Sequence, residues 1–210
     1  MSERRLLKLA KVVSAIFSPF YVTCALFAYL VFNNYARLLF YGYATTVWGY
    51  LLLVFIVFCF TIFLPLFTIR IYRRMIGVST WKFSSRKYRL MPYVLTLTSY
   101  VACFMLLNNM SVLSYPTVLM AALFAIVMCV IINIWWKIST HMVGMGGIVG
   151  VVLLASGPHG YNPLWPLCGF LLLSGIVGTS RTLLRQHSLG QIVVGFVLGV
   201  LSALLFVIVI

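Results

Sequence analysis

Residues 180–191 combine a serine, an arginine and a histidine at the edge of a strongly apolar segment. Arg181 and His187 need a reason to be there, because a cation and an imidazole are costly to desolvate at a membrane boundary. Two further basic clusters, residues 82–89 and 137–141, also lie between apolar segments. Basic clusters with histidines predict a membrane enzyme that handles an anion, and phosphate is the anion we expect.

The histidines in two of these clusters suit the hydrolysis of a phosphomonoester or a pyrophosphate. Arginine and lysine neutralise the non-bridging phosphate oxygens, and arginine can do so through two parallel hydrogen bonds. One histidine can attack phosphorus and form a covalent phosphohistidine, while a second protonates the leaving oxygen and later activates water. Because histidine titrates near neutral pH, one imidazole can serve as both acid and base.

The chain is almost without acids: its formal charge of +14 comes from 15 Lys and Arg residues against one acid, Glu3. This composition leaves no carboxylate set for Mg²⁺ or Ca²⁺ and none for a Ser-His-Asp triad or a glycosidase pair. Catalysis must therefore come from His, Lys, Arg, Ser and backbone groups, and we expect neither a metal nor another cofactor.

The distribution of basic residues also bears on partners and topology. They lie in short loops between apolar segments rather than on a folded polar surface, so nucleic-acid binding is not expected. Membrane lipids with anionic headgroups and a lipid phosphate substrate are the expected partners. Apart from Arg37, every Lys and Arg falls on the N-terminal face. The positive-inside rule then predicts a cytoplasmic N-terminus and site. Separately, we expect the protein in a bacterial cytoplasmic membrane.

Apolar blocks predict the helices that must position these residues. A spanning segment has to satisfy its own backbone hydrogen bonds, and this requirement favours helices. We expect an all-α, polytopic integral membrane helix bundle with about six or seven transmembrane helices, since each needs about 20 apolar residues. A single domain over residues 1–210 is expected. The blocks are residues 12–33, 46–69, 92–109, 116–136, 141–157, 163–179 and 188–210.

The order of the blocks predicts where the basic clusters meet. Successive clusters are separated by two blocks, so all three are expected on one face of the membrane. Several glycines follow His141 and His187 in their blocks. Small residues allow close helix packing, so the helices carrying the two histidines are expected to lie together. These glycines are Gly144, Gly146, Gly147, Gly150, Gly195 and Gly199.

The three clusters resemble the signatures of the type-2 phosphatidic acid phosphatase superfamily of membrane lipid phosphatases. Residues 180–187 look like its third signature, S-R-x5-H-x3-D. Residues 139–141 are similar to its second, P-S-G-H, and residues 82–89 to its first, K-x6-R-P. The order along the chain matches, and the resemblance covers about residues 80–195.

The resemblance implies a role for each matching residue. His187 would be the nucleophile, and His141 would be the general acid that protonates the leaving lipid or phosphate. Members of this family need no metal. The phosphate would be held by Arg181, Arg89, Ser139, the backbone around Thr140, and either Lys82 or Arg86.

The sequence departs from the family pattern at several positions. Gln191 replaces the aspartate that orients the nucleophilic histidine. At i+4 on a helix, its amide oxygen can still accept a hydrogen bond from His187, but a neutral group stabilises imidazolium less. Slower chemistry or a shifted pH optimum is therefore expected. An alternative function is non-catalytic binding or transport of a lipid phosphate. Bacterial relatives usually work on the periplasmic face, so the side of the site stays open.

Overall fold

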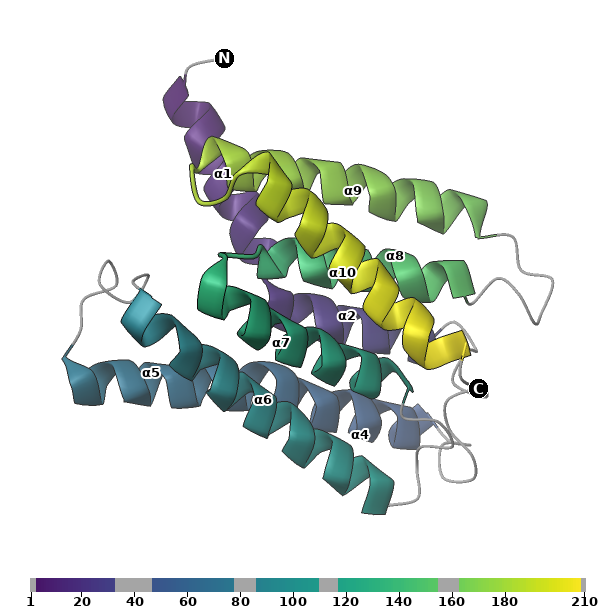
Figure 1. The fold of residues 1–210 in the computed structure, drawn as a ribbon. Helices are drawn as coiled ribbons and strands as arrows, with labels where there is room; N and C mark the ends of the chain where they lie inside the picture. The colour runs from purple at the N-terminus through teal and green to yellow at the C-terminus, as the bar shows by residue number, and fades with distance from the viewer. Residues whose placement is uncertain (1–2, 33–46, 78–85, 110–116, 155–162, 209–210) are drawn as a thin grey trace. The chain divides into compact units, whose positions relative to one another are not determined.

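The computed structural model describes residues 3–32, 47–77, 86–109, 117–154 and 163–208, where every regular element is a helix (Figure 1). The all-α prediction is therefore confirmed for these residues. The elements are α1 (Glu3–Ile16), α2 (Pro19–Phe32), α4 (Val47–Phe58), the π-helical turn η1 (Cys59–Phe63), α5 (Leu64–Ile76), α6 (Arg86–Asn109), α7 (Thr117–Trp135), α8 (Thr140–Leu154), α9 (Leu164–Leu183) and α10 (Leu189–Ile208).

Several of these helices have the length and composition of membrane spans. Within the described residues, 4 helices qualify, or up to 5 if the bent pair α1 and α2 forms one span. The helices over Thr140–Leu154 and Leu189–Leu205 are apolar but shorter. The structure is thus that of an α-helical membrane protein, and the larger number of spans expected from the sequence is not reached by these criteria.

The first apolar block, residues 12–33, was expected to form the first span, and the structure divides it between α1 and α2. The chain bends by 54° between α1 and α2. Pro19 begins α2, and proline has no N–H to continue the hydrogen-bond ladder of the preceding helix. The break gives α1 a direction of its own and lets it pack against α9 (Figure 1).

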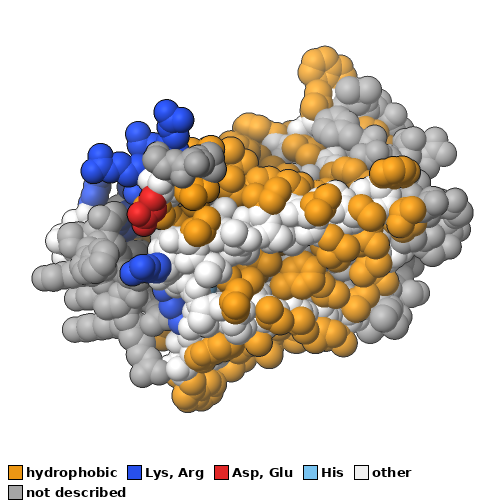
Figure 2. Space-filling view, turned by 90° about the horizontal axis from the view of Figure 1, so that it is seen from above, with side chains coloured by type: hydrophobic (Ala, Val, Ile, Leu, Met, Phe, Trp, Pro, Cys, Tyr) orange, Lys and Arg blue, Asp and Glu red, His pale blue; other side chains and the backbone are white. Residues whose placement is uncertain are grey.

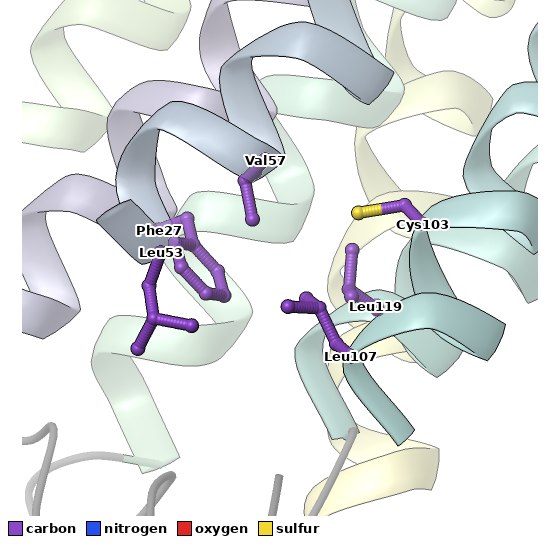
Figure 3. Close-up of a cluster of buried hydrophobic side chains, with 6 residues drawn as sticks. All are labelled: Phe27, Leu53, Val57, Cys103, Leu107 and Leu119. Carbon is purple, nitrogen blue, oxygen red and sulfur yellow. The ribbon is translucent and has the colours of Figure 1, made fainter. Parts of the chain in front are cut away.

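The helices form two compact units. One contains Cys24–Ile134, and the other contains Met1–Thr23 with Trp135–Ile210. The first unit is built around a cluster of buried apolar side chains from α2, α4, α6 and α7 (Figure 3). The cluster consists of Phe27, Leu53, Val57, Cys103, Leu107 and Leu119. The second unit carries both clustered histidines, so the candidate site is built within it.

Glycines bring α8 and α10 into backbone contact in this second unit. A Cβ on Gly199 would collide with the carbonyl oxygen of Val143, and one on Gly146 with the carbonyl oxygen of Phe196. A Cβ on Gly195 would lie 2.7 Å from the carbonyl oxygen of Ser139. The close packing expected of the helices whose glycines follow His141 and His187 is therefore confirmed.

Candidate functional site

His187 lies in the short turn between α9 and α10, and the end of α9 sets the direction of this turn. The N–H of Gln186 donates to the carbonyl of Arg181 at 3.2 Å, and that of Arg185 to the carbonyl of Thr182 at 2.9 Å. This pair of bonds is a Schellman motif, which closes a helix through a left-handed residue. Arg185 occupies that position, with φ 51°.

The left-handed conformation of Arg185 predicts a stabilising substitution. A side chain with a Cβ costs about 1 kcal/mol or more in this region, whereas glycine adopts it freely. Arg185→Gly is therefore expected to raise the free energy of unfolding by about 1 kcal/mol, measured by thermal or denaturant unfolding in detergent. Arg185→Ala, which removes the same charge but keeps the strain, is the control. Equal stabilities of the two variants would contradict the explanation.

The start of α10 fixes His187 from the other side. The Gln191 side-chain oxygen accepts from the backbone N–H of Ser188 at 3.2 Å, and Ser188 Oγ lies 3.5 Å from the N–H of Gln191. This reciprocal arrangement is a capping box. Gln191 Oε1 also lies 3.2 Å from His187 Nδ1, which is the hydrogen bond expected from the i+4 spacing. The S-x-x-Q pattern of the capping box is readable in the sequence and was not used there.

These bonds determine the tautomer of His187. Because a backbone N–H can only donate, the atom of Gln191 that faces Ser188 must be the amide oxygen. The same oxygen then accepts from His187, so Nδ1 of the neutral ring carries the proton. The lone pair of Nε2 is left available, as a nucleophilic histidine requires.

The surroundings of His187 also favour its neutral form. Burial, followed by the positive charges of Lys137 and Arg181, lowers the pKa of His187 from 6.5 to about 4. Lys137 Nζ donates to the carbonyl of Gln186 at 2.7 Å, so it pins the turn beside the histidine. At neutral pH, His187 is therefore an uncharged imidazole between two cations.

The second histidine, His141, is held by a residue that sequence reasoning missed. His141 Nε2 lies 3.0 Å from the backbone carbonyl of Ser14 and 3.4 Å from its hydroxyl. Arg181 Nη1 donates to the same hydroxyl at 2.6 Å. Ser14 thus joins the general-acid candidate of α8 to the phosphate-binding candidate of α9.

Three buried polar atoms of the candidate residues have no hydrogen-bond partner. They are Ser139 Oγ, His141 Nδ1 and Arg181 Nε. Ser139 is fully buried and directly precedes Thr140, the first residue of α8. The first N–H groups of a helix have no acceptor within it and favour an anion. Because a buried polar group without a partner is costly, the donors among these atoms, Ser139 Oγ and Arg181 Nε, suit a ligand with acceptor oxygens.

The cations of the site have almost no acid to neutralise them. Glu3 is the only acidic residue of the chain, against 15 Lys and Arg residues. In the described residues, no group of three or more His, Cys, Asp or Glu side chains could hold a metal ion. The electrostatics therefore favour a bound anion. The view in Figure 2 shows Lys and Arg side chains gathered at one end and apolar side chains over much of the rest.

The remaining candidates belong to the first signature. Arg86 and Arg89 lie in the first turns of α6, in the unit Cys24–Ile134, and their side chains are outside the described residues. Lys82 is also outside the described residues. The structure therefore brings together His187, Gln191, Arg181, His141, Ser139 and Thr140. The phosphate-binding roles of Lys82, Arg86 and Arg89 stay predictions.

Comparisons with known proteins do not place the chain in a group. No family model, no curated protein and no solved structure matches it.

Proposed function

We propose that this protein is a metal-independent membrane phosphatase that hydrolyses a lipid phosphate or pyrophosphate through a phosphohistidine. The carrying observation is the pair of imidazoles beside Arg181. Each histidine has one ring nitrogen against a neutral oxygen, and Nδ1 of His141 is buried without a hydrogen-bond partner. In each ring, one nitrogen is thus suited to hold the imidazole in place, and the other nitrogen is suited to take part in the reaction.

The proposed reaction has two steps. Nε2 of His187 attacks phosphorus, and the bond from phosphorus to the leaving oxygen breaks as the N–P bond forms. The bound phosphate anion stabilises the cationic, doubly protonated ring of His141, and this imidazolium gives its Nδ1 proton to that oxygen. Nδ1 then takes a proton from water, whose oxygen attacks phosphorus and breaks the N–P bond. Arg181, Ser139 and the first N–H groups of α8 stabilise the phosphoryl oxygens.

The substrate class follows from the apolar helices that surround the site. We propose a polyprenyl pyrophosphate, phosphatidate, phosphatidylglycerophosphate or phosphorylated lipid A, with its tail along the bilayer and its headgroup in the basic site. The proposal includes a bundle of six or seven spans in a bacterial cytoplasmic membrane. It also includes the family's remaining phosphate contacts from Lys82 or Arg86, and from Arg89.

Phosphate release by the purified protein tests this proposal. The protein in detergent, with EDTA present, is offered polyprenyl pyrophosphate, phosphatidate and phosphatidylglycerophosphate in parallel. We expect release from at least one substrate, with an unchanged rate when EDTA is omitted. The best substrate identifies the headgroup and tail that the site accepts. No release from any of them would contradict a phosphatase.

A second candidate function is the binding or transport of a lipid phosphate without cleavage. One observation favours it: the aspartate of the third signature is absent, and Gln191 in its place completes the capping box of α10. The same assay separates the two functions. Saturable binding of a phosphate headgroup without phosphate release would support the second candidate.

The neutral partner of His187 predicts the pH dependence of the reaction. Protonation of Nε2 removes the nucleophile, so the acidic limb of the wild-type pH–rate profile should lie near the His187 pKa of about 4. In Gln191→Asp, a carboxylate near Nδ1 stabilises imidazolium and raises this pKa. The acidic limb of the pH–rate profile should therefore move to higher pH.

Gln191→Asn is the matched control for this charge. It has the length of aspartate and no charge, so its acidic limb should stay near that of the wild type. The carboxylate should also increase the rate at neutral pH by about tenfold, because it stabilises the cationic ring formed during attack. Superimposable profiles for Gln191→Asp and Gln191→Asn would contradict the orienting role of residue 191.

A further inference from the structure

Ser14 differs from three other buried serines of the second unit in the way its hydroxyl is used. Ser174, Ser180 and Ser202 each donate to the carbonyl four residues earlier in their own helix. Such bonds satisfy a hydroxyl locally and need no partner from elsewhere. The Ser14 hydroxyl instead lies against Arg181 and His141, which are 167 and 127 residues away in the chain.

The contact with Arg181 fixes one end of a guanidinium. Nη1 donates to Ser14 Oγ at 2.6 Å, whereas Nε is buried without a partner. A guanidinium is planar, so holding Nη1 also sets the direction of Nε. Ser14 thereby holds Arg181 through Nη1 and leaves the buried Nε without a partner from the protein.

The contact with His141 fixes the other imidazole. A backbone carbonyl can only accept, so the bond of 3.0 Å to the Ser14 carbonyl places the proton of the neutral ring on Nε2. Nδ1 is then the nitrogen left for chemistry, and it is buried without a partner. Ser14 does for His141 what Gln191 does for His187.

Most of the helix that carries Ser14 is exposed or half-buried. Only Ala10 and Ser14 of α1 are buried; Leu6, Leu7 and Val13 are half-buried, and the remaining side chains are exposed. Its buried positions therefore serve the contact with α9 and the site rather than a core of its own.

We infer that Ser14 is a positioning residue of the site: its hydroxyl orients Arg181 and its carbonyl orients His141. The N-terminal helix α1 is then a functional part of the phosphate site. The catalytic consequence rests on the proposed function, but the two contacts do not, so they can be tested separately.

Phosphate affinity tests whether Ser14 contributes to the phosphate site. Binding of inorganic phosphate to the full-length protein in detergent is measured for the wild type, Ser14→Ala, Ser14→Thr and Ser174→Ala. Ser14→Ala should bind phosphate about tenfold more weakly, which corresponds to about 1.4 kcal/mol. Ser14→Thr keeps a hydroxyl and should stay close to the wild type. Ser174→Ala removes an equally buried hydroxyl that bonds only within α9, and it should leave the affinity unchanged.

Nitrogen NMR of the arginine side chains tests the contact without phosphate. A buried, hydrogen-bonded guanidinium N–H exchanges slowly with water, and its signal is assigned to Arg181 by its loss in Arg181→Lys. The slow signal should be present in the wild type and Ser174→Ala, absent in Ser14→Ala and restored in Ser14→Thr.

The two measurements separate failure of this inference from failure of the proposed function. An unchanged slow signal in Ser14→Ala would overturn the inference whether or not phosphate binds. Tighter phosphate binding by Ser14→Ala would also overturn it, because Ser14 would then compete with the anion. Absence of both phosphate binding and phosphate release in the wild type would overturn the proposed function, and the NMR result alone would then decide the role of Ser14.

Discussion

The His187→Ala variant is expected to release phosphate at least about a thousandfold more slowly than the wild type. The proposed reaction needs a nucleophile. Removal of a residue that acts as part of one catalytic unit typically lowers the rate by this factor or more. His187 Nε2 is the candidate because its ring is neutral and Nδ1 is engaged by Gln191. The measurement is phosphate release from the best substrate, with protein whose thermal unfolding matches the wild type.

Trapping of the intermediate distinguishes the two histidines. Rapid acid-free quenching of the wild type with labelled substrate should give an acid-labile, alkali-stable phosphoprotein, and His187→Ala should give none. With a lipid substrate, His141→Asn should release phosphate about 100- to 10,000-fold more slowly than the wild type, because a general acid typically contributes a factor of this size. With p-nitrophenyl phosphate, whose leaving group needs little protonation, it should accumulate the phosphoprotein. Label on His187→Ala would contradict the assigned nucleophile.

The sequence predicted the helices better than their interruptions. Each apolar block contains at least one helix, because a continuous apolar run has a strong and local signature. The bend before Pro19 was missed, although proline is a known point of interruption, because the apolar run continues through it. The number of spans depends on the lengths of the helices. The apolar blocks do not determine where a helix ends, and α8 is shorter than a span requires by length.

The candidate site was predictable where its contacts are local in sequence. The bond from His187 to Gln191 follows from the i+4 spacing, and the S-x-x-Q capping box is equally local. No local sequence pattern identified Ser14 as part of the site. Its partners are more than a hundred residues away, and the apolar run around it resembles an ordinary span. Contacts of this kind depend on how α1 packs against α9, which spacing along the chain does not encode.

The packing of α8 against α10 predicts the largest effect on stability. In Gly199→Ala, the new Cβ would collide with the carbonyl oxygen of Val143 and lie 2.7 Å from the backbone nitrogen of Gly147. Both obstacles are backbone, so no side-chain rotation relieves them and the helices must separate. Overpacking of this kind costs about 1–3 kcal/mol or more. We expect a clear fall in the thermal unfolding temperature in detergent.

Gly147→Ala is the matched control, because the same substitution on the facing helix meets nothing within 4 Å of its Cβ. Alanine is the better helix former by up to about 1 kcal/mol, so this variant should be as stable as the wild type or more stable. Separation of α8 and α10 would also move the two histidines apart, since a Cβ at the neighbouring Gly195 faces the carbonyl of Ser139 at 2.7 Å. Gly199→Ala should therefore lose phosphate affinity at temperatures where it is still folded. Equal unfolding temperatures for the two alanine variants would contradict the backbone contact on which the geometry of the site depends.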